Sequence, residues 1–148
     1  ALAITAAYLP PSEHREPIEW NPEMSRRARA VPVWAALATL GRSGAADLVD
    51  RCCALARRFA AGLADLDGAE VLNDVVLNQV LVRFGDDDAV TAGVIEAIQR
   101  DGTCWMGGTT WRGRAAMRIS VSNWSTTDAD VDRSLAAITR CLGQGQPA

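Results

Sequence analysis

The stretch that decides the fold runs from residue 68 to residue 84: Gly68-Ala69-Glu70-Val71-Leu72-Asn73-Asp74-Val75-Val76-Leu77-Asn78-Gln79-Val80-Leu81-Val82-Arg83-Phe84. Within it, the spacing of apolar residues falls from the 3.6-residue period of a helix to the 2-residue period of a strand. We therefore predict strands over residues 70–72 and 76–84. Because the second stretch carries apolar residues on both faces, we expect it in the interior of a sheet.

The segment before this stretch has the clearest helical period in the chain. Between Gly44 and Leu66, apolar residues recur at steps of three and four, while most of the charged residues fall on the other side of the helix. The recurring residues are Ala45, Leu48, Val49, Cys52, Leu55, Ala56, Phe59 and Leu63. We expect a core-facing helix here.

The N-terminal region differs in composition. Residues 1–24 contain four of the six prolines and no long apolar period, which predicts an extended connector. A helix is predicted from Ser25 to Leu40, ended by Gly41. Pro32 lacks an amide donor, so this helix either starts close to Val31 or bends there.

The region after Phe84 predicts a helix, a hairpin and a last helix. Asp86-Asp87-Asp88 can cap a helix over residues 89–100, which ends at Asp101-Gly102. Strands are predicted over residues 103–111 and 114–122, joined at Arg112-Gly113. Thr127-x-x-Asp130 resembles a capping box with aspartate in place of glutamate, and it opens a helix that runs to about Leu142.

These elements predict an α+β domain. The connections are too short for parallel crossovers, so we expect a largely antiparallel four-stranded sheet with helices on one face. We assign residues 1–24 to the connector, 25–43 to a linking helix and 44–148 to a small C-terminal domain.

Composition excludes several classes of protein. The chain is 49% hydrophobic and 22% charged, with a formal net charge of −3 and its arginines interleaved with 18 acids, so we expect no nucleic-acid partner. The apolar start at residues 1–9 is too short to be a membrane span. The lack of an initial Met fits a start inside a longer polypeptide.

Cysteine spacing argues against a metal site. The four cysteines form no CxxC pair and the chain has one histidine, so we predict buried reduced thiols and a cytoplasmic protein. Of the adjacent Cys52 and Cys53, we expect one to face the core.

Among the residues of the predicted strands, Arg118 is the candidate for binding a ligand. Alternation in residues 117–122 puts Met117, Ile119 and Val121 on one face and Arg118, with two serines, on the other. A guanidinium is planar, forked and permanently charged, which suits a carboxylate ligand. From the pattern alone, an exposed or salt-bridged structural arginine is the alternative.

Two further stretches are candidates. Ser25-Arg26-Arg27-x-Arg29 is a basic cluster at a helix start and could hold an anion such as phosphate; the alternative is a solvated helix start or ion pairs with nearby acids. The aromatic and glycine cluster 104–111 could line a pocket or supply core packing with a glycine bend.

The same stretches carry a family resemblance. They are Tyr8-Leu9, Trp20-x-Pro22-Glu23-x-Ser25-Arg26-Arg27-Ala28-Arg29-x-x-x-Val33-Trp34, Val71-Leu72-Asn73, Leu77-Asn78-Gln79-Val80-Leu81-Val82-Arg83-Phe84 and Met117-Arg118-Ile119-Ser120-Val121-Ser122-Asn123. In order and spacing they resemble the carboxy-terminal part of pyridoxal-phosphate-dependent group II amino-acid decarboxylases, which include aromatic-L-amino-acid and glutamate decarboxylases.

The resemblance implies the small C-terminal domain of a fold-type I, aspartate-aminotransferase-like enzyme that acts as a homodimer in amino-acid metabolism. It implies an amino-acid substrate and pyridoxal phosphate as cofactor, bound mainly by a large domain upstream. Arg118 matches the strand arginine that receives a substrate or product carboxylate in glutamate-acting members. Ser25 and Arg26 match the segment that approaches the active site.

The absence of lysine limits what the resemblance implies for this chain. All 15 basic residues are arginine, so no lysine of this chain can form the Schiff base from which the family's chemistry starts. We expect part of a carboxy-lyase that is inactive alone, with no catalytic residue in these 148 residues and a substrate that the sequence leaves open. The alternatives are a stand-alone binding or interaction module, or the small domain of an aminotransferase or aldehyde synthase.

Overall fold

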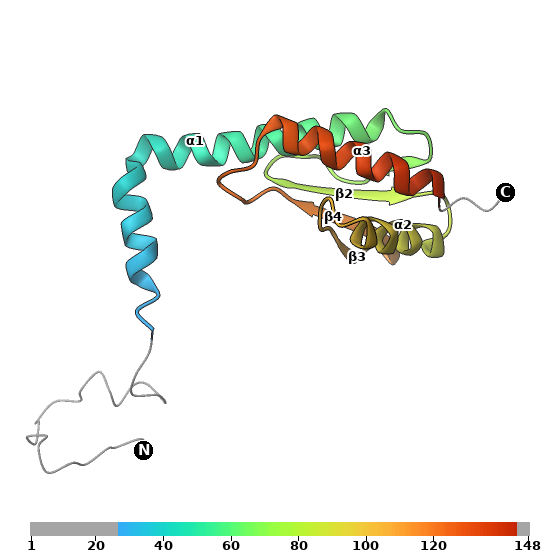
Figure 1. Cartoon of the computed structure of the whole chain (residues 1–148), viewed down its shortest axis with the longest axis horizontal. Helices are drawn as coiled ribbons and strands as arrows, with labels where there is room; N and C mark the ends of the chain where they lie inside the picture. Colours follow the sequence, from blue (N-terminus) through green and yellow to red (C-terminus); the bar gives the residue numbers. More distant parts are fainter. Residues whose placement is uncertain (1–26, 145–148) are drawn as a thin grey trace, which may run out of the picture. The chain divides into compact units, whose positions relative to one another are not determined.

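The computed structural model describes residues 27–144, and in this range the protein has an α+β fold (Figure 1). The elements in chain order are α1 (Ala30–Ala64), β1 (Ala69–Val71), β2 (Gln79–Phe84), α2 (Asp88–Asp101), β3 (Gly107–Trp111), β4 (Arg114–Ser120) and α3 (Asp128–Gln144). The predicted fold class is confirmed. The chain divides into two compact units between Gly41 and Arg42.

The described part of the first unit is the start of α1. The helix begins at Ala30, and Pro32 lies in its first turn, where a missing amide costs no helical hydrogen bond. Of the two predicted possibilities, a start near Val31 is therefore the correct one. Gly41 leaves the helical region, with φ 64° and ψ −172°, and confirms the predicted interruption. The helix resumes at Arg42 without an intervening loop.

The sheet of the second unit is antiparallel throughout, in the order β1-β2-β4-β3. The predicted interior position of β2 is confirmed. β2 starts at Gln79, however, and not at Val76. The Asn73 side chain explains the difference, because its Nδ2 donates to Gln79 O and its Oδ1 accepts from Leu81 N, so an amide side chain closes the β1–β2 loop.

The hairpin strands are also shorter than predicted. β3 begins at Gly107, and just before it Gln99 Nε2 of α2 donates to Met106 O at 2.8 Å, so this carbonyl bonds a helix side chain. β4 ends at Ser120, after which Val121 N donates to Asn78 O.

Local capping signals are confirmed. Asp87 caps α2 by accepting from Ala89 N, and Gly102 ends this helix in the left-handed conformation. Arg112 and Gly113 both have positive φ, as a tight hairpin turn requires. Thr127 N donates to Asp130 Oδ2 at 2.8 Å and Asp130 N donates back to Thr127 Oγ1 at 3.4 Å, which completes the capping box.

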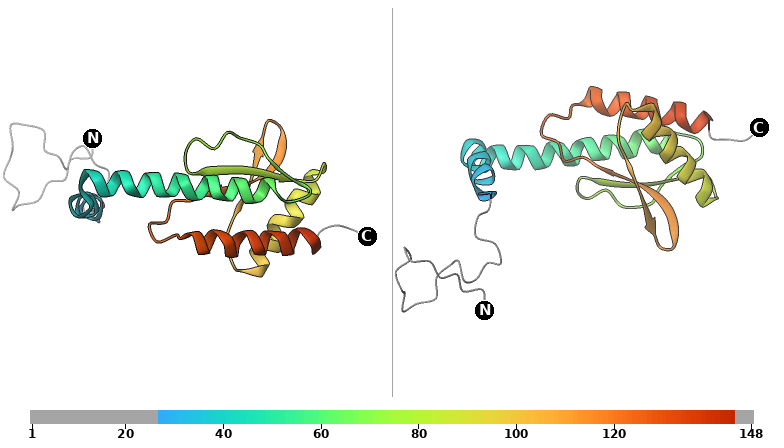
Figure 2. Two further views of the ribbon diagram at one scale, coloured as in Figure 1. Left: turned by 90° about the horizontal axis from the view of Figure 1, so that it is seen from above. Right: turned by 60° about the horizontal axis from the view of Figure 1, so that its bottom comes forward.

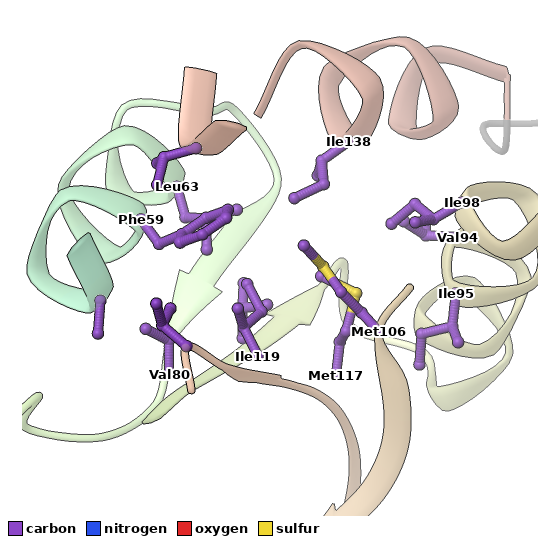
Figure 3. Close-up of a cluster of buried hydrophobic side chains, with 14 of the residues drawn as sticks. Phe59, Leu63, Val80, Val94, Ile95, Ile98, Met106, Met117, Ile119 and Ile138 are labelled. Atoms are coloured by element: carbon purple, nitrogen blue, oxygen red, sulfur yellow. The ribbon is translucent and has the colours of Figure 1, made fainter. Parts of the chain in front are cut away.

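The helices of the second unit cover one face of the sheet (Figure 2). Figure 3 shows the core that forms between them: Phe59 and Leu63 from α1, Val80 from β2, Val94, Ile95 and Ile98 from α2, Met106, Met117 and Ile119 near β4, and Ile138 from α3. Cys52 and Cys53 are both buried, which corrects the expectation that only one would be. Neighbouring helical residues differ by about 100° in direction, so a sufficiently wide buried face covers both.

Candidate carboxylate-binding site

The sheet face opposite the helices carries Arg118. Directly paired residues of an antiparallel sheet point to the same side, so Gln79, Leu81, Arg118 and Ser120 share this open face. Met117 and Ile119 are 0% and 4% exposed, whereas Arg118 and Ser120 are exposed. The predicted alternation along β4 is confirmed, and the strand holds the guanidinium toward the open side.

The flanks of Arg118 differ. Leu81 of β2 lies opposite it on one side and Gly107 of β3 on the other. A Cβ placed on Gly107 would meet no atom within 4 Å. The β3 side of Arg118 is therefore open to an incoming group.

Arg118 also lacks an acidic partner within the described part of the chain. There the arginines that form ion pairs are Arg58, Arg83, Arg114, Arg133 and Arg140. The sequence pattern left open that Arg118 is a structural arginine in a salt bridge. No such salt bridge is seen among residues 27–143. An exposed guanidinium with no acidic partner among the described residues has the chemistry to bind an external carboxylate.

The basic cluster at the start of α1 is only partly visible. Ser25 and Arg26 lie outside the described residues. Arg27 and Arg29 are exposed, and Arg29 N donates to Arg27 O at 2.8 Å. Anion binding by this cluster stays a prediction.

The aromatic and glycine cluster of residues 104–111 contributes both to the core and to the lining of a pocket. Met106 is buried in the core, and Cys104 and Trp105 line a pocket of about 430 Å³, which we call the α3 pocket. Its lining consists of Phe59, Thr103, Cys104, Trp105, Met106, Ile119, Ser120, Val121, Ser122, Asn123, Ser125, Thr126, Asp130 and Ser134. The sequence analysis missed the contributions of α3 and the β4–α3 loop, because residues that carry no local motif are joined there only by folding.

The environment of Cys104 favours the protonated thiol over the nucleophilic thiolate. Burial raises the pKa of Cys104, so the thiol stays protonated at neutral pH. Among the described residues, no group of three or more His, Cys, Asp or Glu side chains could hold a metal ion. No helix of residues 27–144 has both the length and the apolar character needed to cross a bilayer.

Comparison with known proteins yields structural neighbours only. No protein-family model matches the sequence, and no curated protein matches it. The chain superposes on TDC from Oryza sativa, solved with PLP and tryptamine, with a TM-score of 0.80 at 19% identity, over 97% of this chain and 32% of that one.

Two further structures show the same likeness. Tryptophan decarboxylase from Catharanthus roseus, in complex with L-tryptophan, matches with a TM-score of 0.76 at 18% identity, over 86% of this chain and 29% of that one. 4-Hydroxyphenylacetaldehyde synthase from Rhodiola rosea matches with a TM-score of 0.75 at 19% identity, over 86% and 29%. The chain thus spans about a third of the length of these proteins and has the fold of that third.

Proposed function

We propose that this chain is the C-terminal part of a pyridoxal-phosphate-dependent amino-acid decarboxylase, a carboxy-lyase that releases CO2 from an L-amino acid. The observation that carries the proposal is the superposition on Oryza sativa TDC, which extends over 97% of the chain. The sequence resemblance to group II decarboxylases supports it independently. In this proposal residues 1–24 are the connector, 25–43 the linking helix and 44–148 the small domain of a cytoplasmic homodimer.

The residues present do not fit covalent attachment of the cofactor. The chain has no lysine, and a Schiff base with pyridoxal phosphate needs a lysine amine. The cofactor would therefore be held mainly by polypeptide outside these 148 residues. We expect this chain to be inactive by itself.

Within the complete enzyme, Arg118 would receive a carboxylate of the substrate or product. The exposed guanidinium, its open flank at Gly107 and the lack of an acidic partner among residues 27–143 support this role. A bidentate contact would fix the orientation of the ligand as well as its position. Ser25 and Arg26 would approach the same active site from the linking segment.

A spectroscopic experiment tests the proposal. The 148-residue chain mixed with pyridoxal phosphate should not develop the visible absorbance band of a lysine-bound cofactor. A longer polypeptide that contains this chain and its upstream coding sequence should develop the band and release CO2 and an amine. A lysine-type band from the 148 residues alone, or an upstream sequence without a cofactor lysine, would contradict the proposal.

A second activity has a specific observation in its favour. The Rhodiola rosea aldehyde synthase superposes almost as well as the decarboxylases do, so the fold does not separate the two chemistries. Product analysis separates them, because an aldehyde synthase forms an aldehyde where a decarboxylase forms an amine. An aminotransferase would form a keto acid.

A non-enzymatic function remains the alternative from another class. The second unit closes a hydrophobic core of its own, which fits a stand-alone binding module. An open reading frame that starts near Ala1 would favour this alternative over the decarboxylase.

A further inference from the structure

The α3 pocket lies mainly on the helix-covered side of the sheet and reaches the end of β4 at Ser120. Phe59 of α1 and Asp130 and Ser134 of α3 contribute to its lining, and these helices cover the opposite face of the sheet. Arg118 is not among the lining residues. A ligand of this pocket does not need Arg118, so its binding can be tested separately from the function proposed above.

Hydrogen bonds hold the β4–α3 wall of the pocket in place. Asn123 Oδ1 accepts from Ser125 N at 3.1 Å and from Ser125 Oγ at 3.2 Å. Arg51 Nη2 of α1 donates to Trp124 O at 2.6 Å, and Thr126 N donates to Asn123 O at 3.2 Å. The loop is thus tied both to itself and to a helix.

The opposite wall, residues 103–106, is fixed in the same way. Thr103 N donates to Asp101 Oδ1 at 3.2 Å, and Asp101 pairs with Arg140 of α3 at 3.2 Å. Gln99 Nε2 holds Met106 O. Because both walls are anchored, the pocket exists before a ligand arrives, which is typical of small-molecule sites.

Two hydroxyls of the pocket already donate their protons within the protein. Ser125 Oγ donates its proton to Asn123 Oδ1, and Ser134 Oγ donates to Asp130 O at 2.8 Å. Each hydroxyl oxygen then keeps lone pairs that can accept from a ligand. At these two positions the pocket accordingly favours a ligand group that donates.

The charged side chains near the pocket also favour a cationic ligand. Asp130 is the ionised side chain of the lining, and no arginine lines the pocket although the chain has 15 basic residues. Arg133 pairs with Asp130 and offsets part of its charge. The lining therefore offers a carboxylate no basic partner.

The apolar part of the lining can hold the body of a ligand. Phe59, Met106 and Ile119 belong to the core cluster of Figure 3 and also line the pocket. Trp105 lines it as well and is 76% exposed. An exposed indole beside acceptor groups attracts a cation through the negative face of its ring.

We propose that the α3 pocket binds a small organic ammonium ion. Its apolar body contacts Phe59, Met106 and Ile119, and its ammonium group donates to the hydroxyl oxygens of Ser125 and Ser134. An ammonium has three donors and no acceptor, which complements this lining.

Three probes of similar size but different charge test the proposal on the 148-residue chain. They are 2-phenylethylamine, 2-phenylethanol and phenylacetate, titrated into isotope-labelled protein while amide resonances of Trp105, Ser125 and Ser134 are followed by NMR. We expect saturable shifts with the amine, with a dissociation constant on the order of 10 mM or tighter. The amine should bind at least tenfold more tightly than phenylacetate.

Matched variants locate the site. Trp105→Ala should weaken amine binding at least threefold, whereas Trp111→Ala, which changes a tryptophan outside the lining, should leave it unchanged. Ser134→Leu should fill the pocket and abolish binding, with Thr139→Leu on the exposed side of α3 as its control. If Ser134→Leu does not fold, the tryptophan pair decides.

Three results would overturn the proposal. They are no saturable shift with the amine, equal binding of the amine and either other probe, and an unchanged affinity in Trp105→Ala. Each is independent of pyridoxal phosphate, so failure here leaves the decarboxylase proposal standing, and the reverse also holds.

Discussion

Arg83 and Asp88 form an ion pair in which one partner is buried and the other is not. Arg83 Nη1 lies 2.5 Å from Asp88 Oδ1, and the side chains are 4% and 55% exposed. The same guanidinium also donates to Gly85 O, Asp86 O and Ala115 O. One arginine of β2 thereby joins the β2–α2 turn to β4.

Replacement of Arg83 should destabilise the domain substantially. In Arg83→Ala, the carbonyls and the carboxylate that it binds lose a charged donor, and we expect a loss of about 2–3 kcal/mol in the free energy of unfolding. Urea unfolding of the wild type and the variant measures this loss. Arg100→Ala, on an exposed part of α2, is the control and should cost less than about 0.5 kcal/mol. Equal losses in the two variants would show that the Arg83 contacts contribute little.

Stability should fall in acid because three aspartates are held in the ionised form. Arg83 lowers the pKa of Asp88, Thr103 and Arg140 lower that of Asp101, and Thr127 lowers that of Asp130. A lowered folded-state pKa stabilises the protein above the unfolded value near 4, and this contribution disappears as the pH falls through the folded value.

Urea midpoints between pH 7 and pH 2.5 measure this dependence. Asp88→Asn should lower stability at pH 7 and flatten the decline below about pH 4, since the variant has one titrating group fewer. A midpoint that stays constant down to pH 2.5 is incompatible with three stabilising carboxylates.

The capping box at α3 should contribute measurably to stability. Thr127→Ala removes the side-chain contacts with Asp130 and should cost about 1 kcal/mol. Thr139→Ala, on the exposed side of the same helix, is the matched control. Thermal unfolding followed by circular dichroism compares them, and similar melting temperatures would argue against the cap.

A cavity in the core should be costly. Leu63 is 0% exposed, so Leu63→Ala should destabilise the domain by about 2–5 kcal/mol. Leu77→Ala removes the same atoms from a side chain that is 62% exposed and should cost less than about 0.5 kcal/mol. Denaturant unfolding of both variants gives the comparison.

Arg118→Ala tests the carboxylate role in the complete enzyme. We expect kcat/KM to fall more than threefold, while the stability of the small domain stays within about 0.5 kcal/mol of the wild type because Arg118 is exposed. Arg112→Ala, which changes an arginine in the hairpin turn that lies over Trp111, is the control and should keep full activity. A fall of less than threefold, or less than ~0.7 kcal/mol, would exclude the role.

The secondary structure of the chain could largely be predicted, because it depends on signals within a few residues. The period change at Gly68, the caps at Asp87 and Thr127 and the turn at Arg112-Gly113 each act through neighbouring backbone groups, and the structure confirms them. Antiparallel pairing followed from connection length. The alternation that turns Arg118 away from Met117 followed from strand geometry alone.

Long-range contacts account for what the sequence left open. The start of β2 depends on the side-chain amide of Asn73 meeting Gln79 and Leu81. The buried state of Arg83 depends on one carbonyl of β4, that of Ala115, as well as on the carbonyls of its own turn. The α3 pocket joins Phe59, Trp105, Asn123 and Ser134, which lie far apart along the chain. The sequence by itself determined the order of the elements, the helix caps and the faces of the strands, because these follow from near-neighbour geometry. Only the tertiary structure decided which polar groups are paired and where a cavity forms, because both depend on atoms that folding alone brings together.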